Sequence, residues 1–243
     1  MKRLFFITGA GLSAESGIPT FRETGGLWED YDVDEICNIA TFYINYNKVH
    51  NFYNKLRVNL QNYEPNEAHH FIAEQQKKYN ATHITTNVDD LAERANGSVL
   101  HLHGILTEVV ENYNSANEDY SVLKCNYNEY IPKDGVIAKP NVVMFGESIT
   151  FIDGKKQQLY KELYEILDSL TKNDTVIIIG SSDTVLNFSS KVGLATNAYT
   201  VNVNPKKNTN DSVFDVNIYK PVTEALEELS TIIEERLNVQ SVS

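Results

Sequence analysis

A glycine-rich loop directly after an apolar segment at the start of the chain constrains the fold more than any other feature. Residues 3–8 (RLFFIT) have the apolar, β-branched composition of a buried strand, and the run 9–14 (GAGLSA) follows at once. This order fits the G-x-G-x-x-G/A pattern, in which glycines let the backbone approach a pyrophosphate at the start of a helix. The usual acidic residue about twenty positions on is missing from a strand end, because Glu29 and Asp30 follow a Gly-Gly-Leu-Trp loop. The loop therefore predicts a dinucleotide-binding α/β fold that holds the ribose in another way.

Further apolar segments alternate with helical patterns along the chain. Residues 175–179 (TVIII) are the second clear strand candidate, whereas the polar stretch 111–130 has no clear periodicity. Alternating strands and helices are typical of a doubly wound parallel sheet. We therefore predict an α/β protein with a Rossmann-like parallel sheet and a small, irregular second lobe. Weaker strand candidates are 83–85, 141–144 and 199–203, and helix candidates are 66–79, 159–170 and 222–237.

The charge balance and the apolar runs exclude two classes of partner. The sequence holds 21 Lys and Arg against 33 Asp and Glu, which gives a net charge of −12. Such a chain repels phosphate backbones, so we expect no direct nucleic-acid binding. No apolar run approaches the ~18 residues of a membrane span, and the short run near the start is too short for a signal peptide. We therefore expect a soluble, cytoplasmic protein with no membrane partner.

Cysteine usage limits the metal chemistry. The chain has 2 cysteines, Cys37 and Cys125, and no CxxC pair. This count excludes both a multi-bridge disulfide framework and a zinc site made of four cysteines. The histidines at 69–70 and at 101 and 103 leave a site with carboxylates open, although adjacent histidines are more often ordinary surface and core residues. We predict no zinc and assign no metal ligands.

The glycine loop continues into a longer motif. Residues 9–22 read GAGLSAESGIPTFR, and residues 26–28 (GLW) follow. This run closely resembles the opening motif of the sirtuins, the NAD-dependent protein lysine deacylases. Later segments resemble further motifs of that family in the same order: 86–89 (TNVD), 101–104 (HLHG), 142–147 (VVMFGE), 180–182 (GSS) and 201–204 (VNVN).

The resemblance covers nearly the whole chain and implies one catalytic domain, residues 1–243. The Rossmann-like lobe would come from about 1–30, 80–107 and 140–243, and the small lobe from about 31–79 and 108–139. The implied reaction cleaves the bond between nicotinamide and ribose in NAD and moves the acyl group of an acyl-lysine to ADP-ribose. Such a protein takes NAD as its cofactor and an acyl-lysine protein or peptide as its partner.

The resemblance also implies residue roles. His103 would be the general base that removes a ribose hydroxyl proton, a task that suits imidazole because its pKa lies near neutrality. Asn87 would orient the ribose or a water, and Asp89 would hold the nicotinamide carboxamide together with the Ile18 region. An Asx turn that caps a helix near Asp90 is the structural alternative for this loop. His101 is expected to be structural.

Two sets of binding residues follow from the matching motifs. Phe145, Gly146 and Glu147 would offer backbone edges to an extended peptide, as in strand addition. The substrate-binding set comprises Tyr53, Arg57, Val143, Phe145, Gly146 and Glu147. The cofactor-binding set comprises Gly9, Ala10, Gly11, Ser13, Ile18, Pro19, Phe21, Arg22, Trp28, Thr86, Asn87, Asp89, Gly180, Ser181, Ser182, Asn202 and Asn204.

Three departures from the family keep alternatives open. The four zinc cysteines are absent, Thr86 replaces a Gln, and Leu56 stands where members that remove acidic acyl groups carry an Arg. The tyrosine of that last pattern, Tyr53, is either part of the acyl pocket or an apolar wall residue. With Thr86, residues 85–87 read TTN, which also resembles sirtuin-like domains that hydrolyse NAD without a protein substrate. An NAD glycohydrolase or ADP-ribosyltransferase is therefore the alternative function, and a catalytically silent NAD or ADP-ribose sensor is a third.

Overall fold

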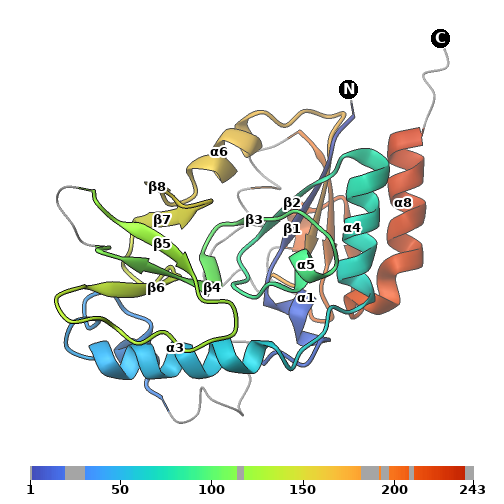
Figure 1. The fold of residues 1–243 in the computed structure, drawn as a ribbon. Coiled ribbons are helices and arrows are strands. Elements are labelled where there is room, and N and C mark those ends of the chain that lie inside the picture. Colours follow the sequence, from blue (N-terminus) through green and yellow to red (C-terminus); the bar gives the residue numbers. More distant parts are fainter. Residues whose placement is uncertain are drawn as a thin grey trace.

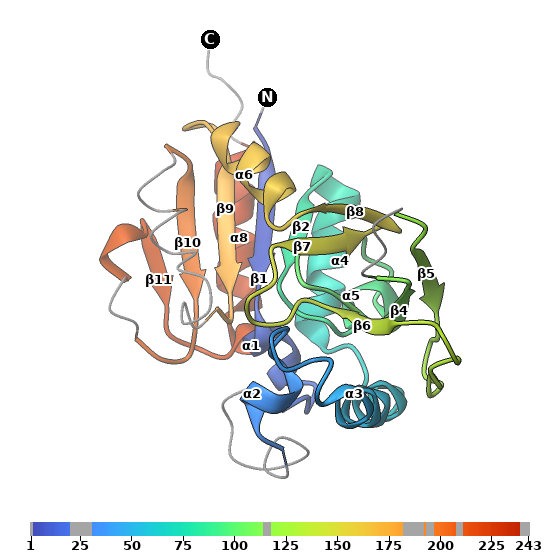
Figure 2. The ribbon, with the colours of Figure 1, turned by 90° about the vertical axis from the view of Figure 1, so that its left-hand side faces the viewer.

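The main lobe is a six-stranded sheet in which every neighbouring pair is parallel. The computed structural model describes residues 2–19, 31–113, 118–181, 192, 197–207 and 211–238. The strand order is β11-β10-β9-β1-β2-β3, so the direction of winding reverses between β9 and β1 (Figure 2). This confirms the predicted doubly wound fold. The strands are β1 (Leu4–Thr8), β2 (Thr82–Thr85), β3 (Leu100–His101), β9 (Thr175–Ile179), β10 (Tyr199–Val203) and β11 (Val216–Ile218).

Helices cover both faces of this sheet. Successive side chains of a strand point to opposite faces, so neighbouring residues of β1 pack against different helices. Phe6 packs with Ile72 of α4 (Glu67–Tyr79) and Ile233 of α8 (Leu226–Asn238), which lie side by side in Figure 1. Ile7 packs on the other face with Leu163 of α6 (Lys161–Asp168). The chain enters α8 through a 3₁₀ turn, η2 (Val222–Ala225). None of the helices described combines the length and apolarity that crossing a membrane requires.

The small lobe is a three-stranded antiparallel sheet packed on one long helix. Its order is β5-β4-β6, with β4 (Gly104–Glu111), β5 (Ser121–Lys124) and β6 (Ala138–Val142). The helix α3 (Tyr46–Leu60) runs along this sheet (Figure 1). The short helix α2 (Val33–Ile36) precedes it in the chain (Figure 2). A hairpin of β7 (Ile149–Ile152) and β8 (Lys155–Gln158) follows β6.

Two expectations from the sequence are wrong here. The strand expected at 141–144 as part of the parallel sheet is instead the end of β6. This strand pairs antiparallel with β4, and Val142 is opposite Gly104 in the register. The stretch 111–130 is not wholly irregular, because β5 within it pairs with the end of β4. Both β4 and β6 therefore belong to the small sheet.

Buried polar side chains of α3 hold this lobe together. The Asn54 side chain exchanges two hydrogen bonds with the backbone of Tyr130, at 2.8 and 3.0 Å. The Arg57 guanidinium donates to the Leu106 carbonyl at 2.7 Å and to Asn54 Oδ1 at 2.5 Å. In the described part of the chain, no group of three or more His, Cys, Asp or Glu side chains is arranged to hold a metal ion. The lobe thus contains an internal network of buried polar side chains.

Candidate active site

The loops after β1 and β9 meet at the point where the strand order reverses, which is where open α/β sheets bind ligands. The Gly9 amide donates to the Ile179 carbonyl at 2.9 Å, and the Gly11 amide donates to the Gly180 carbonyl at 3.0 Å. A Cβ on Gly11 would lie 2.5 Å from Gly180 Cα, and Gly180 itself has a φ of +64°. Only glycine fits both positions, so this backbone contact accounts for the glycine pattern that opens α1 (Ala10–Ala14).

Ser13 of α1 joins the loop after β2. Its hydroxyl donates to Asp89 Oδ2 at 2.8 Å and accepts from Asn87 Nδ2 at 3.1 Å. The other oxygen of Asp89 accepts from the Leu91 amide at 3.2 Å, where α5 (Leu91–Arg94) begins. Burial raises the pKa of Asp89, and the bonds from Ser13 and Leu91 oppose that rise. The Asp89 carboxylate thus makes the Asx-turn contact of the structural alternative and also binds Ser13.

His103 follows β3 and faces this loop. Its ring is hydrogen bonded to the Thr86 backbone, and its Nε2 lies 2.8 Å from the Tyr160 hydroxyl. Burial lowers the pKa of His103 to about 4, against the effect of the Thr86 bond. The imidazole is therefore neutral at physiological pH, which is the form that a general base needs.

His101 holds the same loop from inside. Its Nδ1 lies 2.8 Å from the Asn87 carbonyl, and its Nε2 lies 2.9 Å from a carboxylate oxygen of Glu93. Burial lowers the pKa of His101, but the Glu93 carboxylate and the Asn87 carbonyl outweigh it and raise the pKa overall. This geometry suits the structural role expected for His101, because the ring fixes the backbone of Asn87.

The far side of the switch point carries two of the predicted cofactor residues. Asn204 Nδ2 donates to the Ser181 carbonyl at 2.8 Å, so the loops after β9 and β10 are joined. Asn202, by contrast, is buried within β10 and bonds to Asn217 at 3.1 Å and to Asp211 at 3.3 Å, at the start of η1 (Asp211–Val213). Its side chain therefore links β10 to β11 and to the start of η1 in this structure.

The remaining predicted cofactor residues are placed as follows. The Thr86 amide donates to the Thr8 carbonyl at 3.0 Å, and the Ile18 amide donates to the Ser13 carbonyl at 3.3 Å. Ala10 is exposed beside this loop, and Pro19 is partly buried. Four predicted residues lie outside the part of the chain that the structure describes: Phe21, Arg22, Trp28 and Ser182.

The predicted peptide-binding segment lies beside His103. The Val143 amide donates to the His103 carbonyl at 2.9 Å. Phe145, however, already pairs through its backbone: its amide donates to the Cys37 carbonyl at 2.7 Å, and its carbonyl accepts from the Ile39 amide at 3.0 Å. The edge of Phe145 is therefore used within the chain, contrary to the expectation that it is presented to a peptide.

Glu147 turns inward at the end of this segment. Its side chain is 8% exposed, pairs with buried Lys139 at 3.0 Å and accepts from the Met144 amide at 2.6 Å. Gly146 precedes it with a φ of +85°. Glu147 thus fixes the turn that shapes the segment, and its carboxylate faces the protein rather than a ligand.

Two predicted substrate residues lie in the interior. Tyr53 is buried, with its hydroxyl 3.4 Å from Cys37 Sγ, and burial raises its pKa. This placement matches the apolar-wall interpretation. Arg57 is fully buried, and its Nε and Nη1 donate to Leu106 and Asn54 of the small lobe, whereas its Nη2 is buried without a hydrogen-bond partner. The structure therefore does not bring Arg57 to the site, because its guanidinium is a structural element of α3.

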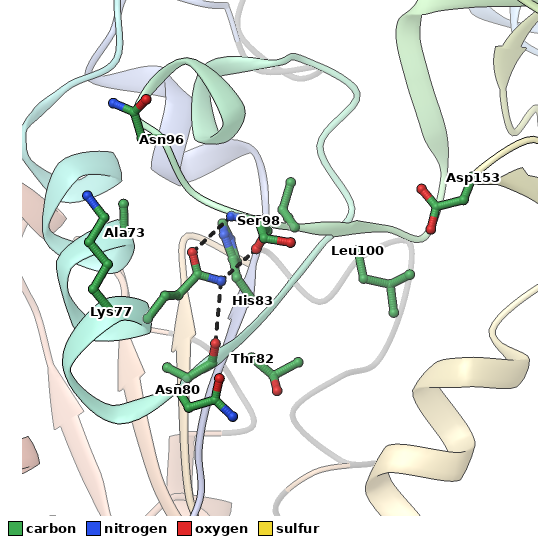
Figure 3. Close-up of a pocket in the computed structure, with 12 residues that line it drawn as sticks. Ala73, Lys77, Asn80, Thr82, His83, Asn96, Ser98, Leu100 and Asp153 are labelled. Carbon is green, nitrogen blue, oxygen red and sulfur yellow. Dashed lines mark hydrogen bonds between the residues drawn. The ribbon is translucent and has the colours of Figure 1, made fainter.

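Sequence reasoning missed Tyr160, whose hydroxyl contacts the proposed base. No local motif marks this residue, which stands immediately before α6. A separate cavity of about 490 Å³, lined by Lys77, His83 and Asp153 among others, lies where β2 and β3 begin (Figure 3). That is the opposite end of the strands from His103, so this cavity is not part of the candidate site.

Fold and site together define a doubly wound α/β protein with a polar site at its switch point. The sequence model of the Sir2 family matches residues 9–187. An NAD-dependent protein deacylase of Helicobacter hepaticus is 33% identical over 274 aligned residues, which cover 97% of this chain and 98% of that protein. One of Bacteroides thetaiotaomicron is 39% identical over 189 residues, covering 75% and 76%. The chain belongs to the Sir2 family.

Solved structures agree with this assignment. A mutant Sir2 homologue in complex with ADP-ribose matches with a TM-score of 0.79 and 28% identity, covering 98% of this chain and 94% of that one. A Sir2 homologue in complex with NAD matches with a TM-score of 0.76 and 28% identity, covering 96% and 90%. The similarity therefore extends over both lobes.

Proposed function

We propose that this protein is an NAD-dependent protein lysine deacylase that transfers the acyl group of an acyl-lysine to ADP-ribose and releases nicotinamide. One observation carries the proposal: a neutral, partly buried His103 faces the loop in which Ser13 joins Asn87 to Asp89. The names of the relatives and the NAD and ADP-ribose complexes of similar structures support the same reaction.

The residues at the switch point fit NAD. Gly9, Gly11 and Gly180 leave no side chain over the loop where a pyrophosphate would lie. Ser181 and Asn204, which are hydrogen bonded to each other, would lie at the ribose and adenine side. NAD would supply the ADP-ribosyl group that accepts the acyl group after nicotinamide leaves. The partly buried Asp89 and Asn87 offer oxygen and amide groups suited to a carboxamide and a ribose.

His103 would act after the bond to nicotinamide has broken. Its Nε2 would accept the proton of a ribose hydroxyl, so that this oxygen can attack the acyl carbon. A bond from its ring to the Thr86 backbone would keep the proton on Nδ1 and leave Nε2 free to accept. The hydrogen bond between the Val143 amide and the His103 carbonyl would hold the segment that binds the acyl-lysine next to the base.

Hydrolysis of NAD without a protein substrate is the second candidate, and one observation favours it. The backbone of Phe145 is paired with Cys37 and Ile39, and the Val143 amide is paired with His103, so a peptide would have to add at Gly146 or displace one of these contacts. A hydrolase has no need of a peptide edge.

Mass analysis of the products after incubation with NAD, with and without an acetyl-lysine peptide, separates these functions. We expect O-acetyl-ADP-ribose and deacetylated peptide only when the peptide is present. ADP-ribose formed equally without peptide would instead assign the hydrolase. Unchanged NAD in both incubations would reject both enzymes in favour of a sensor.

A further inference from the structure

Tyr160 makes a contact that the proposed reaction cannot leave in place. Its hydroxyl lies 2.8 Å from Nε2 of His103, and the two rings meet edge to face with centroids 5.7 Å apart. When the ring proton of His103 is on Nδ1, Nε2 carries the lone pair and can accept from a hydroxyl at this distance. Burial, followed by the neighbouring Tyr164, raises the pKa of Tyr160 to about 12, so its hydroxyl keeps the proton that it can donate to Nε2.

A neutral imidazole has one acceptor nitrogen. In this structure Tyr160 uses it, yet a general base must offer that nitrogen to the substrate. We propose that Tyr160 is a positioning residue that caps His103 Nε2 until the ribose hydroxyl displaces it. The proposal rests on the proposed function, because it takes His103 as the base.

The backbone at Tyr160 is built for such an exchange. Tyr160 has a φ of +65°, a left-handed conformation that residues other than glycine rarely adopt. It stands at the amino end of α6, where its carbonyl accepts from the Tyr164 amide at 3.0 Å. Residues in such conformations concentrate at sites that switch or clamp a ligand.

The cap is also attached to the candidate peptide segment. The β7–β8 hairpin and its two flanking residues, Ser148 and Leu159, connect Glu147 to Tyr160 along the chain. Its base is closed by the Leu159 amide, which donates to the Ser148 carbonyl at 2.9 Å. A displacement of the segment around Phe145 therefore reaches Tyr160 through a single closed hairpin, which gives the cap a path for release.

The test compares Tyr160→Phe with Tyr164→Phe in the full chain, because Tyr164 lies one turn along the same helix and contacts the Tyr160 ring. The His103 ring signal, identified by its loss in His103→Gln, is titrated by NMR without cofactor. A hydroxyl that donates to the neutral ring holds the pKa down, so Tyr160→Phe should raise the pKa of His103 by about 0.4–1. Tyr164→Phe should leave it unchanged. Equal titration in the parent and Tyr160→Phe would overturn the cap.

Binding and turnover separate a cap from a proton relay. Without a competitor for Nε2, Tyr160→Phe should bind NAD about 2–10-fold more tightly by calorimetry and deacetylate peptide with kcat within about threefold of the parent. A kcat about 10²-fold lower would mean that the hydroxyl takes part in proton transfer, and an unchanged Kd would mean that it does not compete; either result rejects the cap. If the parent chain deacetylates nothing, the proposed function fails, and the titration still decides whether the cap exists.

Discussion

The hydroxyl of Ser13 lies 2.8 Å from a carboxylate oxygen of Asp89, although the two residues are 76 positions apart in the sequence. The same hydroxyl accepts from Asn87 at 3.1 Å. The loops after β1 and β2 are therefore one hydrogen-bonded unit, and the Ser13 hydroxyl is the group that joins them.

Ser13→Ala should disconnect that unit. Asn87 would lose its acceptor and Asp89 a donor, and an unsatisfied polar group costs about 1–3 kcal/mol. We expect NAD affinity to fall about 10-fold or more by calorimetry. Ser98→Ala is the matched control, because the hydrogen bonds described for exposed Ser98 come from its backbone. An unchanged affinity in Ser13→Ala would remove Ser13 from the site.

Gly11→Ala should disturb the contact between the loops after β1 and β9. The added methyl would meet Gly180 Cα at 2.5 Å, and overpacking of this kind typically costs about 1–3 kcal/mol. We expect a lower free energy of unfolding, measured with denaturant, and loss of NAD binding. Gly135→Ala is the control: its φ of +75° strains the backbone, but its methyl meets nothing within 4 Å, so it should lower stability and leave NAD binding intact. NAD binding at the parent level in Gly11→Ala would show that the close contact is dispensable.

How much the sequence predicted depends on whether the signal was local. The strands β1 and β9 are continuous apolar runs buried on both faces, and their position was evident. The strand β6 carries Lys139 and Pro140, which resemble a loop. Lys139 can be buried only because Glu147 pairs with it, and no local pattern reports that pairing.

The candidate site divides in the same way. Ser13, Asn87, Asp89 and His103 lie in contiguous motifs, so their grouping could be predicted, although their roles stay predictions. Tyr160 joins them only through the path of the β7–β8 hairpin. Arg57 was expected at the substrate because it stands next to the position of the family's arginine. No local pattern reports that Leu106 and Asn54 bind its guanidinium.

Asn54→Ala should weaken the small lobe. The substitution leaves both backbone groups of Tyr130 and one donor of Arg57 without their partner. We expect the free energy of unfolding to fall by about 2–4 kcal/mol, whereas exposed Asn62→Ala should change it little. A chelator should not shift the thermal midpoint of the parent. A large shift on chelation, with about one zinc per chain by elemental analysis, would contradict a lobe held by this network.

The pH dependence of stability should report Asp174. Burial would raise its pKa, but Arg3 and Thr171 outweigh burial and lower the pKa to about 2. A depressed carboxyl pKa stabilises the fold above the ordinary pKa, and this stabilisation is lost as the pH falls toward 2. Asp174→Asn should therefore cost about 1–2 kcal/mol at pH 7 and almost nothing near pH 2. Exposed Asp168→Asn is the control, and an equal cost at both pH values would contradict the assignment.

The most direct test of the proposed chemistry compares His103→Ala with Asn87→Ala in two assays, deacylation of an acetyl-lysine peptide and exchange of labelled nicotinamide into NAD. Because His103 acts only after nicotinamide has left, its loss should reduce deacylated product about 10²–10⁴-fold while exchange persists. Asn87→Ala should weaken both, since Asn87 bonds to Ser13 in the loop proposed to orient the ribose. Full deacylation by His103→Ala would contradict the assignment of the base, and unchanged activity in both variants would place the active site elsewhere.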